Sequence, residues 1–249
     1  MSGSQTSRPL IIQTNDDGPF TKGLRAVREV LQRHGRVVTV VPLQEMSGSS
    51  HALTLGRPLR IKEIEPDIYA VDGTPADSCY LGLFHLFKDE KPDLIVSGLN
   101  NGYNMGEDVI YSGTVAGAME GYFHGISGVA LSARDFSNLD DVCRHVDAFI
   151  SRVLKMTGRF LLNVNYPTGE IRGTRNTRLC SRVYPGNVVP CALNRHKDAL
   201  WIGGVPPVWS DRDGTDINAV MQGYASVTPL QPDLTDERLL EKLGPWSES

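Results

Sequence analysis

The sequence contains none of the common metal-binding motifs built from cysteine and histidine. Its four cysteines form no C-x-x-C pair, and its six histidines form no H-x-H or H-E-x-x-H motif. Structural and catalytic zinc sites are built from these residue types, so their absence argues against zinc. We interpret the cysteines as small apolar side chains in a protein of a reducing compartment.

Three loops that identify large enzyme classes are also missing. No G-x-G-x-x-G follows the first predicted strand, which disfavours a dinucleotide cofactor. No G-x-x-x-x-G-K-[ST] motif occurs, which disfavours an ATP-binding P-loop. The G-x-S-x-G turn of α/β-hydrolases is absent as well.

Charge and hydropathy exclude two kinds of partner. The net charge is −4 and the lysines and arginines are scattered, so no basic field for a nucleic-acid polymer is present. No apolar stretch reaches the length of a membrane span. Residues 1–9 are polar and lack an apolar signal core, so we expect a flexible tail and a cytoplasmic protein.

Strand-like and helix-like segments alternate over the first two-thirds of the chain. This order predicts an α/β fold with a doubly wound, mostly parallel sheet. The predicted strands are 9–12, 37–41, 94–96, 129–131 and 160–164. The predicted helices are 22–34, two segments opening at Thr74 and Ser112, and 142–153.

The remaining segments are shorter and less regular. Strand-like pieces at 52–55, 59–64 and 68–71 predict a small antiparallel excursion. Later pieces predict strands over 178–183, 200–202 and 224–230 and helices over 216–221 and 235–243. We expect one domain over 10–249, with a regular core over about 10–167 and a less regular part over about 168–249.

Two adjacent carboxylates, Asp16 and Asp17, stand immediately after the first predicted strand. Like charges side by side repel, and a hard divalent cation is the simplest counter-ion because it prefers oxygen ligands. Open α/β sheets bind ligands beyond the carboxyl ends of their strands, where this pair is expected. The alternative is a solvated turn, since Asn, Asp and Gly favour turns for local reasons.

Two further loops after predicted strands carry neutral oxygen donors. Ser47 lies in one of them, and Asn100 and Asn104 lie in the other. If the strands are parallel neighbours, these loops open on the same sheet edge as the two carboxylates. Such a donor set suits Mg²⁺ or Mn²⁺ with water completing the coordination. The alternative for residues 97–106 is a long surface loop.

Ser112, Gly113 and Thr114 open a predicted helix that is rich in small residues. A helix N-terminus offers unpaired N–H groups and positive partial charge to a phosphate. The alternative is ordinary N-capping by one of the two hydroxyls. We interpret the acidic clusters at 72–77 and 211–216 as helix caps and turns.

These motifs together resemble the SurE (survival protein E) family of metal-dependent 5′/3′-nucleotidases. The resemblance covers nearly the whole chain in order. The matching segments are TNDDG (14–18), SG (47–48), LTL (53–55), PLR (58–60), GTPAD (73–77), SGLNNGYNMG (97–106), VIYSGTV (109–115), GTD (214–216) and GYASVTPL (223–230).

The resemblance implies roles for individual residues. Those that it assigns to one divalent ion per subunit, Mg²⁺ or Mn²⁺, are Asp16, Asp17, Ser47 and Asn100. Those that it assigns to the phosphate are Asn104, Ser112, Gly113 and Thr114. It also implies a Rossmann-like core, a protruding hairpin and a C-terminal segment exchanged between the subunits of a homodimer or homotetramer. The implied substrates are nucleoside 5′- and 3′-monophosphates, with some activity on short polyphosphate.

The sequence therefore predicts a metal-dependent phosphomonoesterase with Asp16 and Asn104 as catalytic residues. Asp16 would orient or deprotonate the attacking water, and Asn104 and the helix N-terminus would stabilise charge on the phosphoryl oxygens. An alternative enzyme forms an aspartyl-phosphate, but the D-x-D arrangement expected of that class is absent. A non-enzymatic alternative is a nucleotide- or phosphate-sensing module that binds without turnover.

Overall fold

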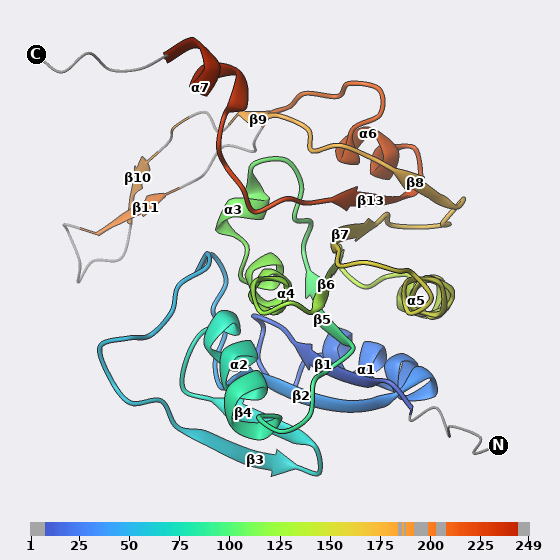
Figure 1. Cartoon of the computed structure of the whole chain (residues 1–249). Helices are drawn as coiled ribbons and strands as arrows, with labels where there is room; N and C mark the ends of the chain where they lie inside the picture. The colour runs from blue at the N-terminus through green and yellow to red at the C-terminus, as the bar shows by residue number, and fades with distance from the viewer. Residues whose placement is uncertain (1–7, 184–185, 187, 192–198, 203–207, 244–249) are drawn as a thin grey trace, which may run out of the picture.

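The computed structural model describes residues 8–183, 186, 188–191, 199–202 and 208–243. Within these residues the main element is a nine-stranded sheet with helices on both faces (Figure 1). The strand order is β3-β4-β2-β1-β5-β6-β7-β13-β8. The strands are β1 (Leu10–Thr14), β2 (Arg36–Pro42), β3 (Ile61–Glu65), β4 (Ile68–Val71), β5 (Leu94–Asn101), β6 (Ser127–Ala133), β7 (Leu161–Tyr166), β8 (Thr174–Asn176) and β13 (Ala225–Pro229).

The centre of the sheet is parallel. Strands β4, β2, β1, β5, β6 and β7 run in the same direction. Every residue of β1 and β7 is buried, as expected for strands that are covered on both faces. β3 and β13 join antiparallel at the two sides of this centre, and β8 extends the sheet beyond β13. The predicted doubly wound, mostly parallel sheet is confirmed.

Helices cover both faces of the parallel centre (Figure 1). α1 (Lys22–His34) and α5 (Leu139–Val153) lie side by side on one face. α2 (Pro75–Leu81), continued by a π-helical turn over Gly82–Leu86, lies with α4 (Gly113–Phe123) on the other. Apolar side chains of both helices join side chains of the sheet in one buried cluster. Those of the helices include Val27, Val30, Leu31, Val142, Val146 and Ile150. The helices predicted over 22–34 and 142–153 are confirmed, and the second begins three residues earlier than predicted.

The winding of the sheet reverses at β1. From β1 the chain continues to β2 and β4 on one side, and later to β5, β6 and β7 on the other. The crevice beyond the carboxyl ends of β1 and β5 is therefore the topological switch point, where open α/β sheets bind ligands. Asp16 follows β1 at this point, and Asn100 lies near the end of β5.

The segment between β2 and α2 differs from the prediction. Residues 52–55 are not a strand, because the Thr54 N–H donates to the Asp77 carboxylate instead of a neighbouring strand. β3 and β4 pair antiparallel as predicted, but they are not a separate excursion. β4 also pairs parallel with β2, which makes both strands part of the main sheet.

The C-terminal region confirms some of the predicted elements. α6 (Asp216–Met221) and β11 (Leu200–Ile202) have the predicted bounds, and α7 (Glu237–Leu243) ends where predicted. Of the strand predicted over 178–183, only β9 (Arg182–Val183) forms, since Arg178 makes an isolated bridge to Thr215.

Two small ladders accompany this region. β12 (Val208–Trp209) pairs with β9, and β10 (Val188–Pro190) pairs antiparallel with β11. The β10–β11 pair stands apart from the main sheet (Figure 1), as expected of the protruding hairpin. The exchange of a C-terminal segment and the single-domain organisation stay predictions. In the described part of the chain, no helix combines the length and apolar character that crossing a bilayer requires.

Candidate functional site

Asp16 and Asp17 lie in a tight loop directly after β1. The Asn15 side chain closes this loop, because its Nδ2 donates to the Gly18 carbonyl at 2.8 Å and its Oδ1 accepts from the Gly18 N–H at 3.2 Å. Gly18 has a φ of +88°, a conformation that favours glycine. Asn15 is itself fully buried. The carboxylates therefore extend from a buried, hydrogen-bonded turn rather than a solvated one.

Asp16 contacts the N-terminus of α4. Thr114 Oγ1 donates to Asp16 Oδ1 at 2.7 Å, and both side chains are buried. A Cβ at Gly113 would lie 3.0 Å from Asp16 Cβ and 3.1 Å from its Oδ2, so a larger residue there would displace the carboxylate. The structure thus brings Asp16 together with two of the three residues predicted at the helix start.

Ser112 is the N-cap of α4. Its Oγ accepts a hydrogen bond from the Val115 N–H at 3.0 Å, so the capping alternative describes this side chain. Gly113 and Thr114 are the first residues of the helix, and their N–H groups have no acceptor within it. These N–H groups and the positive end of the helix dipole can bind an anion beside Asp16.

The environment of both carboxylates disfavours their ionised form. Burial raises the pKa of Asp16 to about 6, against the hydrogen bond from Thr114, and the charge of Asp17 adds to the rise. Burial also raises the pKa of Asp17, against the Asn101 N–H that donates to its Oδ2 at 3.4 Å. The nearby charge of Glu45 raises it further. A bound cation would relieve both the burial and the repulsion.

The loop after β2 lies over Asp16. The Met46 N–H donates to the Asp16 carbonyl at 2.8 Å, which places the following serines at this edge of the sheet. Ser47 is exposed, and its Oγ donates to Glu45 at 2.9 Å. Asp17, Glu45 and Ser47 line one cavity of about 480 Å³. The predicted convergence of the loops after β1 and β2 is observed.

The two predicted site asparagines at the carboxyl end of β5 lie in different surroundings. Asn100 is half-buried, and its Nδ2 donates to the Gly102 carbonyl at 2.9 Å. Asn104 is buried, and its Nδ2 donates to Ser132 Oγ at 2.8 Å. Among the described residues, no hydrogen bond links either side chain to Asp16. Asn100 lies in the last part of β5 rather than in the predicted loop, because β5 continues to Asn101 by pairing with β6, and Asn104 lies in the loop that follows.

Asn104 is held by polar side chains that the sequence analysis missed. Asn163 and Asn165 of β7 both donate to the Asn104 carbonyl, at 2.7 and 3.0 Å. Asn165 Oδ1 also accepts from the Asn104 N–H at 2.9 Å, and Ser132 of β6 holds the side chain. The sequence contains an indication of this role, because two asparagines at alternate positions of a fully buried strand need hydrogen-bond partners.

Asp216 of α6 fixes the next turn of the same loop. This carboxylate is fully buried, and its Oδ2 accepts from the Gly106 N–H at 2.9 Å. Its Oδ1 accepts from the Cys180 N–H at 2.9 Å. The interpretation of 211–216 as caps and turns is therefore incomplete. Asp216 also joins the C-terminal region to the loop that carries Asn104.

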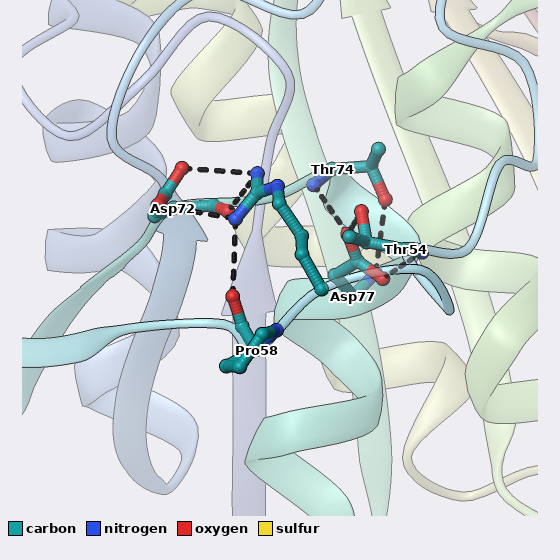
Figure 2. Close-up of polar contacts among 6 residues, drawn as sticks. Thr54, Pro58, Asp72, Thr74 and Asp77 are labelled. Carbon is teal, nitrogen blue, oxygen red and sulfur yellow. Dashed lines mark hydrogen bonds and ion pairs between the residues drawn. The ribbon is translucent and has the colours of Figure 1, made fainter.

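The segment after the serines is attached to α2, as Figure 2 shows. Asp77 forms a capping box with Thr74 at the start of this helix, which confirms the cap interpretation of its cluster. The N–H and Oγ1 of Thr54 donate to the two oxygens of the same carboxylate, at 2.8 and 2.6 Å. Arg57 pairs with Asp72 through two hydrogen bonds of 3.1 Å. The chain that leaves the candidate site is thus fastened to the body of the fold.

The oxygen donors around Asp16 fit a hard divalent cation. Within the described residues, no group of three or more His, Cys, Asp or Glu could hold a metal ion. Coordination by the two carboxylates would therefore be completed by neutral oxygens, such as those of Ser47 and Asn100, and by water. The Ser49 hydroxyl, near the start of α4, is buried without a hydrogen-bond partner. This donor set suits Mg²⁺ or Mn²⁺ and does not suit zinc.

The chain is similar to known proteins over almost its whole length. A protein called 5′-nucleotidase SurE from Anaeromyxobacter dehalogenans (strain 2CP-C) is 44% identical over 244 residues, 95% of each chain. One of the same name from Aquifex aeolicus is 40% identical over 243 residues, 94% of this chain and 97% of that protein.

Structure and family comparisons agree with these relatives. A crystal structure of the SurE protein from Aquifex aeolicus superposes with a TM-score of 0.82 at 39% identity, covering 94% of this chain and 98% of that one. The family described as survival protein SurE matches residues 11–186, which include every candidate site residue named above except Asp216. The chain therefore belongs to the SurE family.

Proposed function

We propose that this chain is a nucleotidase, a metal-dependent phosphomonoesterase that hydrolyses nucleoside 5′-monophosphates to nucleoside and phosphate. Relatives that match 95% of the chain carry the name 5′-nucleotidase SurE, which supports this substrate class. The observation that carries the proposal is the 2.7 Å hydrogen bond between Thr114 and Asp16. It joins a carboxylate suited to a cation to a helix N-terminus suited to a phosphate.

The residues divide into a metal group and a phosphate group. Asp16, Asp17, Ser47 and Asn100 would hold the cation, which when bound supplies Lewis-acid activation of the phosphoryl group and of the attacking water. The N–H groups of Gly113 and Thr114 would bind the non-bridging oxygens of the phosphate, while Ser112 caps the helix that carries them.

Two side chains would act on the reacting atoms. Asn104 is held through its backbone and one amide hydrogen, so the second hydrogen of its Nδ2 can stabilise the developing phosphoryl charge. Asp16 would orient the attacking water and accept its proton.

The finer features of the activity belong to the same proposal. Nucleoside 3′-monophosphates and short polyphosphate would be further substrates, since the helix N-terminus binds a terminal phosphate whatever ester carries it. The cation would be Mg²⁺ or Mn²⁺, one per subunit, because the donors are oxygens only.

A panel of phosphate esters tests the proposal. Purified protein with Mg²⁺ or Mn²⁺ should release phosphate from 5′- and 3′-nucleoside monophosphates and from a generic aryl phosphate. Binding of a nucleotide without release of phosphate under every metal condition would instead support the sensing-module alternative.

The stereochemistry of transfer separates water attack from an aspartyl-phosphate. Direct attack by water on a chiral thiophosphate ester inverts the configuration at phosphorus, whereas a covalent intermediate on Asp16 gives two inversions and net retention. We expect inversion. Retention, or a trapped phospho-aspartate, would support the covalent alternative.

We further propose that the chain works as a homodimer or homotetramer with an exchanged C-terminal segment. Apolar side chains on β10, β11 and α7 are exposed in the single chain, which supports an intersubunit contact. They are Val188, Val189, Leu200, Trp201, Ile202, Leu239, Leu240 and Leu243. The expected cytoplasmic location, and the expected absence of membrane and nucleic-acid partners, stay predictions of the sequence.

A further inference from the structure

Glu120 is a buried carboxylate that the proposed reaction does not use. It lies on α4, and only 3% of its surface is exposed. The other residues of this helix are uncharged, and most of them are small or apolar. A buried charge is costly unless it is paired and hydrogen-bonded, so neighbouring groups must compensate the burial of Glu120.

Two histidines, one before and one after Glu120 in the sequence, form hydrogen bonds with this carboxylate. His51 Nε2 lies 2.5 Å from Glu120 Oε2, and His124 Nε2 lies 2.9 Å from Oε1. Burial raises the pKa of Glu120, but the hydrogen bonds and charges of the two histidines outweigh it and the net pKa is lowered. His124 is the C-cap of the same helix. His51, in contrast, belongs to the segment that lies over Asp16.

The segment 46–51 is attached at three points. At its start the Met46 N–H bonds to the Asp16 carbonyl at 2.8 Å. Next to its end, the N–H and Oγ of Ser50 donate to the Tyr111 and Ile110 carbonyls of α3 (Asp108–Tyr111), at 3.0 and 2.7 Å. At its end His51 bonds to Glu120 and stacks on Phe123 with ring centroids 5.4 Å apart.

The backbone of this segment needs these attachments. Ser50 has a φ of +55°, a left-handed conformation that side chains other than glycine rarely adopt. Such a conformation persists only where surrounding contacts hold it. Ser47 and Ser49, which offer oxygens at the candidate metal edge, lie between the first attachment and the last. These hydroxyls are therefore held between the attachment at Met46 and the adjoining attachments at Ser50 and His51, of which the His51 bond is the last.

We propose that Glu120 is a positioning residue of the nucleotidase site, acting through His51 to hold segment 46–51 against Asp16. This inference rests on the proposed function for its consequence in turnover. Its structural content is independent of turnover, because it states which contact orders the serines. Glu120 lies on the helix whose N-terminus faces the phosphate, so one helix places both the phosphate donors and the serine segment.

The two histidines provide a matched comparison. His51→Ala and His124→Ala each remove one partner of the same carboxylate, from side chains that are 24% and 30% exposed. A merely structural role of Glu120 predicts similar effects of both changes. The positioning role predicts that only His51→Ala disturbs the serines, because His124 lies on the helix of Glu120 itself.

The experiment measures Mn²⁺ affinity, turnover of a 5′-nucleotide and hydrogen exchange of residues 46–51 in the full-length protein. His51→Ala and Glu120→Ala should each weaken Mn²⁺ binding by about tenfold, as residues that orient metal ligands do. Both should speed exchange in the segment. His124→Ala should change Mn²⁺ affinity by less than about twofold, and the His51→Ala/Glu120→Ala double variant should be no weaker than Glu120→Ala, because the two act as one unit.

Glu120→Gln guards against a variant that fails to fold, since it keeps the shape of the side chain and one acceptor for His51. It should fall between the wild type and Glu120→Ala. Equal effects of His51→Ala and His124→Ala, or unchanged exchange in the segment, would overturn the positioning role. If the variants differ in hydrogen exchange and Mn²⁺ affinity as expected but the wild type does not hydrolyse nucleotides, the proposed function alone is overturned.

Discussion

Two regions of this molecule differ in which side chains they bury. At the switch point, Asp16, Asn104 and Asp216 are polar and buried, and each has hydrogen bonds within the chain. On the β10–β11 pair, Trp201 and Ile202 are apolar, yet 63% and 94% exposed. Hydrogen bonds hold buried polar groups in one geometry, whereas exposed apolar side chains favour contact with a partner surface. This contrast supports the proposal that the first region carries the chemistry and the second the contact between subunits.

The largest expected effect breaks the first region. Asp16→Asn removes a metal-binding charge while keeping an acceptor for the Thr114 hydroxyl. Metal activation of a phosphoryl group is worth several kcal/mol, so kcat/KM should fall by about a thousandfold or more. Phosphate release from a 5′-nucleotide under saturating Mn²⁺ measures this effect. A loss smaller than tenfold would mean that Asp16 does not hold the cation.

The same variant should be more stable than the wild type when metal is absent. The pKa of Asp16 in the fold, about 6, lies above its ordinary value of 3.8, so the ionised carboxylate destabilises the metal-free fold at pH 7. A pKa shift of this size corresponds to a destabilisation of about 2–3 kcal/mol at pH 7. This destabilisation disappears as the pH falls from about 6 to about 4, because the folded state then binds the proton. Denaturant unfolding in the presence of a chelator should give Asp16→Asn a higher free energy of unfolding than the wild type at pH 7 and an equal one near pH 4. Mn²⁺ should reverse the order at pH 7 by stabilising only the wild type.

Asn104→Ala is expected to have the next largest effect. It removes one donor to the transition state, which costs about 2–4 kcal/mol, or about 30- to 1000-fold in kcat. Mn²⁺ affinity should stay nearly unchanged, because Asn104 belongs to the phosphate group of residues. Asn218→Ala is the matched control, since that amide donates to Asp211 at the exposed side of α6 and takes no part in the proposed site. Turnover within about threefold of the wild type would contradict the assignment, because it is far below a 2 kcal/mol effect.

Asn100→Ala should give a smaller loss that metal can repair. Asn100 is proposed as a neutral metal ligand, so its removal should weaken Mn²⁺ binding by about 10- to 100-fold without altering the phosphate donors. Activity should therefore be low at limiting Mn²⁺ and recover with excess Mn²⁺. Activity that stays low at saturating Mn²⁺ would place Asn100 with the phosphate instead.

The smallest effect on turnover is expected from the second region. Ile202→Glu places a charge in the exposed apolar surface of β11, where it should weaken the proposed contact between subunits. Light scattering after size exclusion should show a smaller assembly, while turnover per chain at the switch point stays within about twofold, in the range of a surface substitution. An unchanged assembly would exclude β11 from the interface. A large loss of turnover would show that the two regions are not separable.

Periodicity and local signals were sufficient for the regular part of the fold. The bounds of α1 and the start of α2 at Thr74 depend on neighbours in the sequence, so they could be predicted closely. The convergence of Asp16 with the loop after β2 could also be predicted, because parallel neighbours share one edge. The strand predicted over 52–55 was wrong, because the Thr54 N–H donates to the carboxylate of Asp77, which is distant in the sequence, and not to a neighbouring strand.

The supports of the site could not be predicted from local patterns. Asn163 and Asn165 lie in β7, about sixty residues beyond the loop that they hold. Asp216 reaches Gly106 across 110 residues, and only the folded sheet brings them together. Local signals identify the residues that carry chemistry, whereas the contacts that orient them are set by tertiary packing.

The central claim is that Asp16 and the start of α4 form a metal-dependent phosphatase site. The most direct test is to strip the wild type of metal with a chelator and titrate Mn²⁺ back while recording both binding and 5′-nucleotide hydrolysis. We expect no hydrolysis in the metal-free protein and full recovery as about one Mn²⁺ per chain binds, whereas Asp16→Asn should bind Mn²⁺ more weakly and recover about a thousandth of the hydrolysis or less. Full activity in rigorously metal-free protein, or equal recovery in Asp16→Asn, would contradict the account.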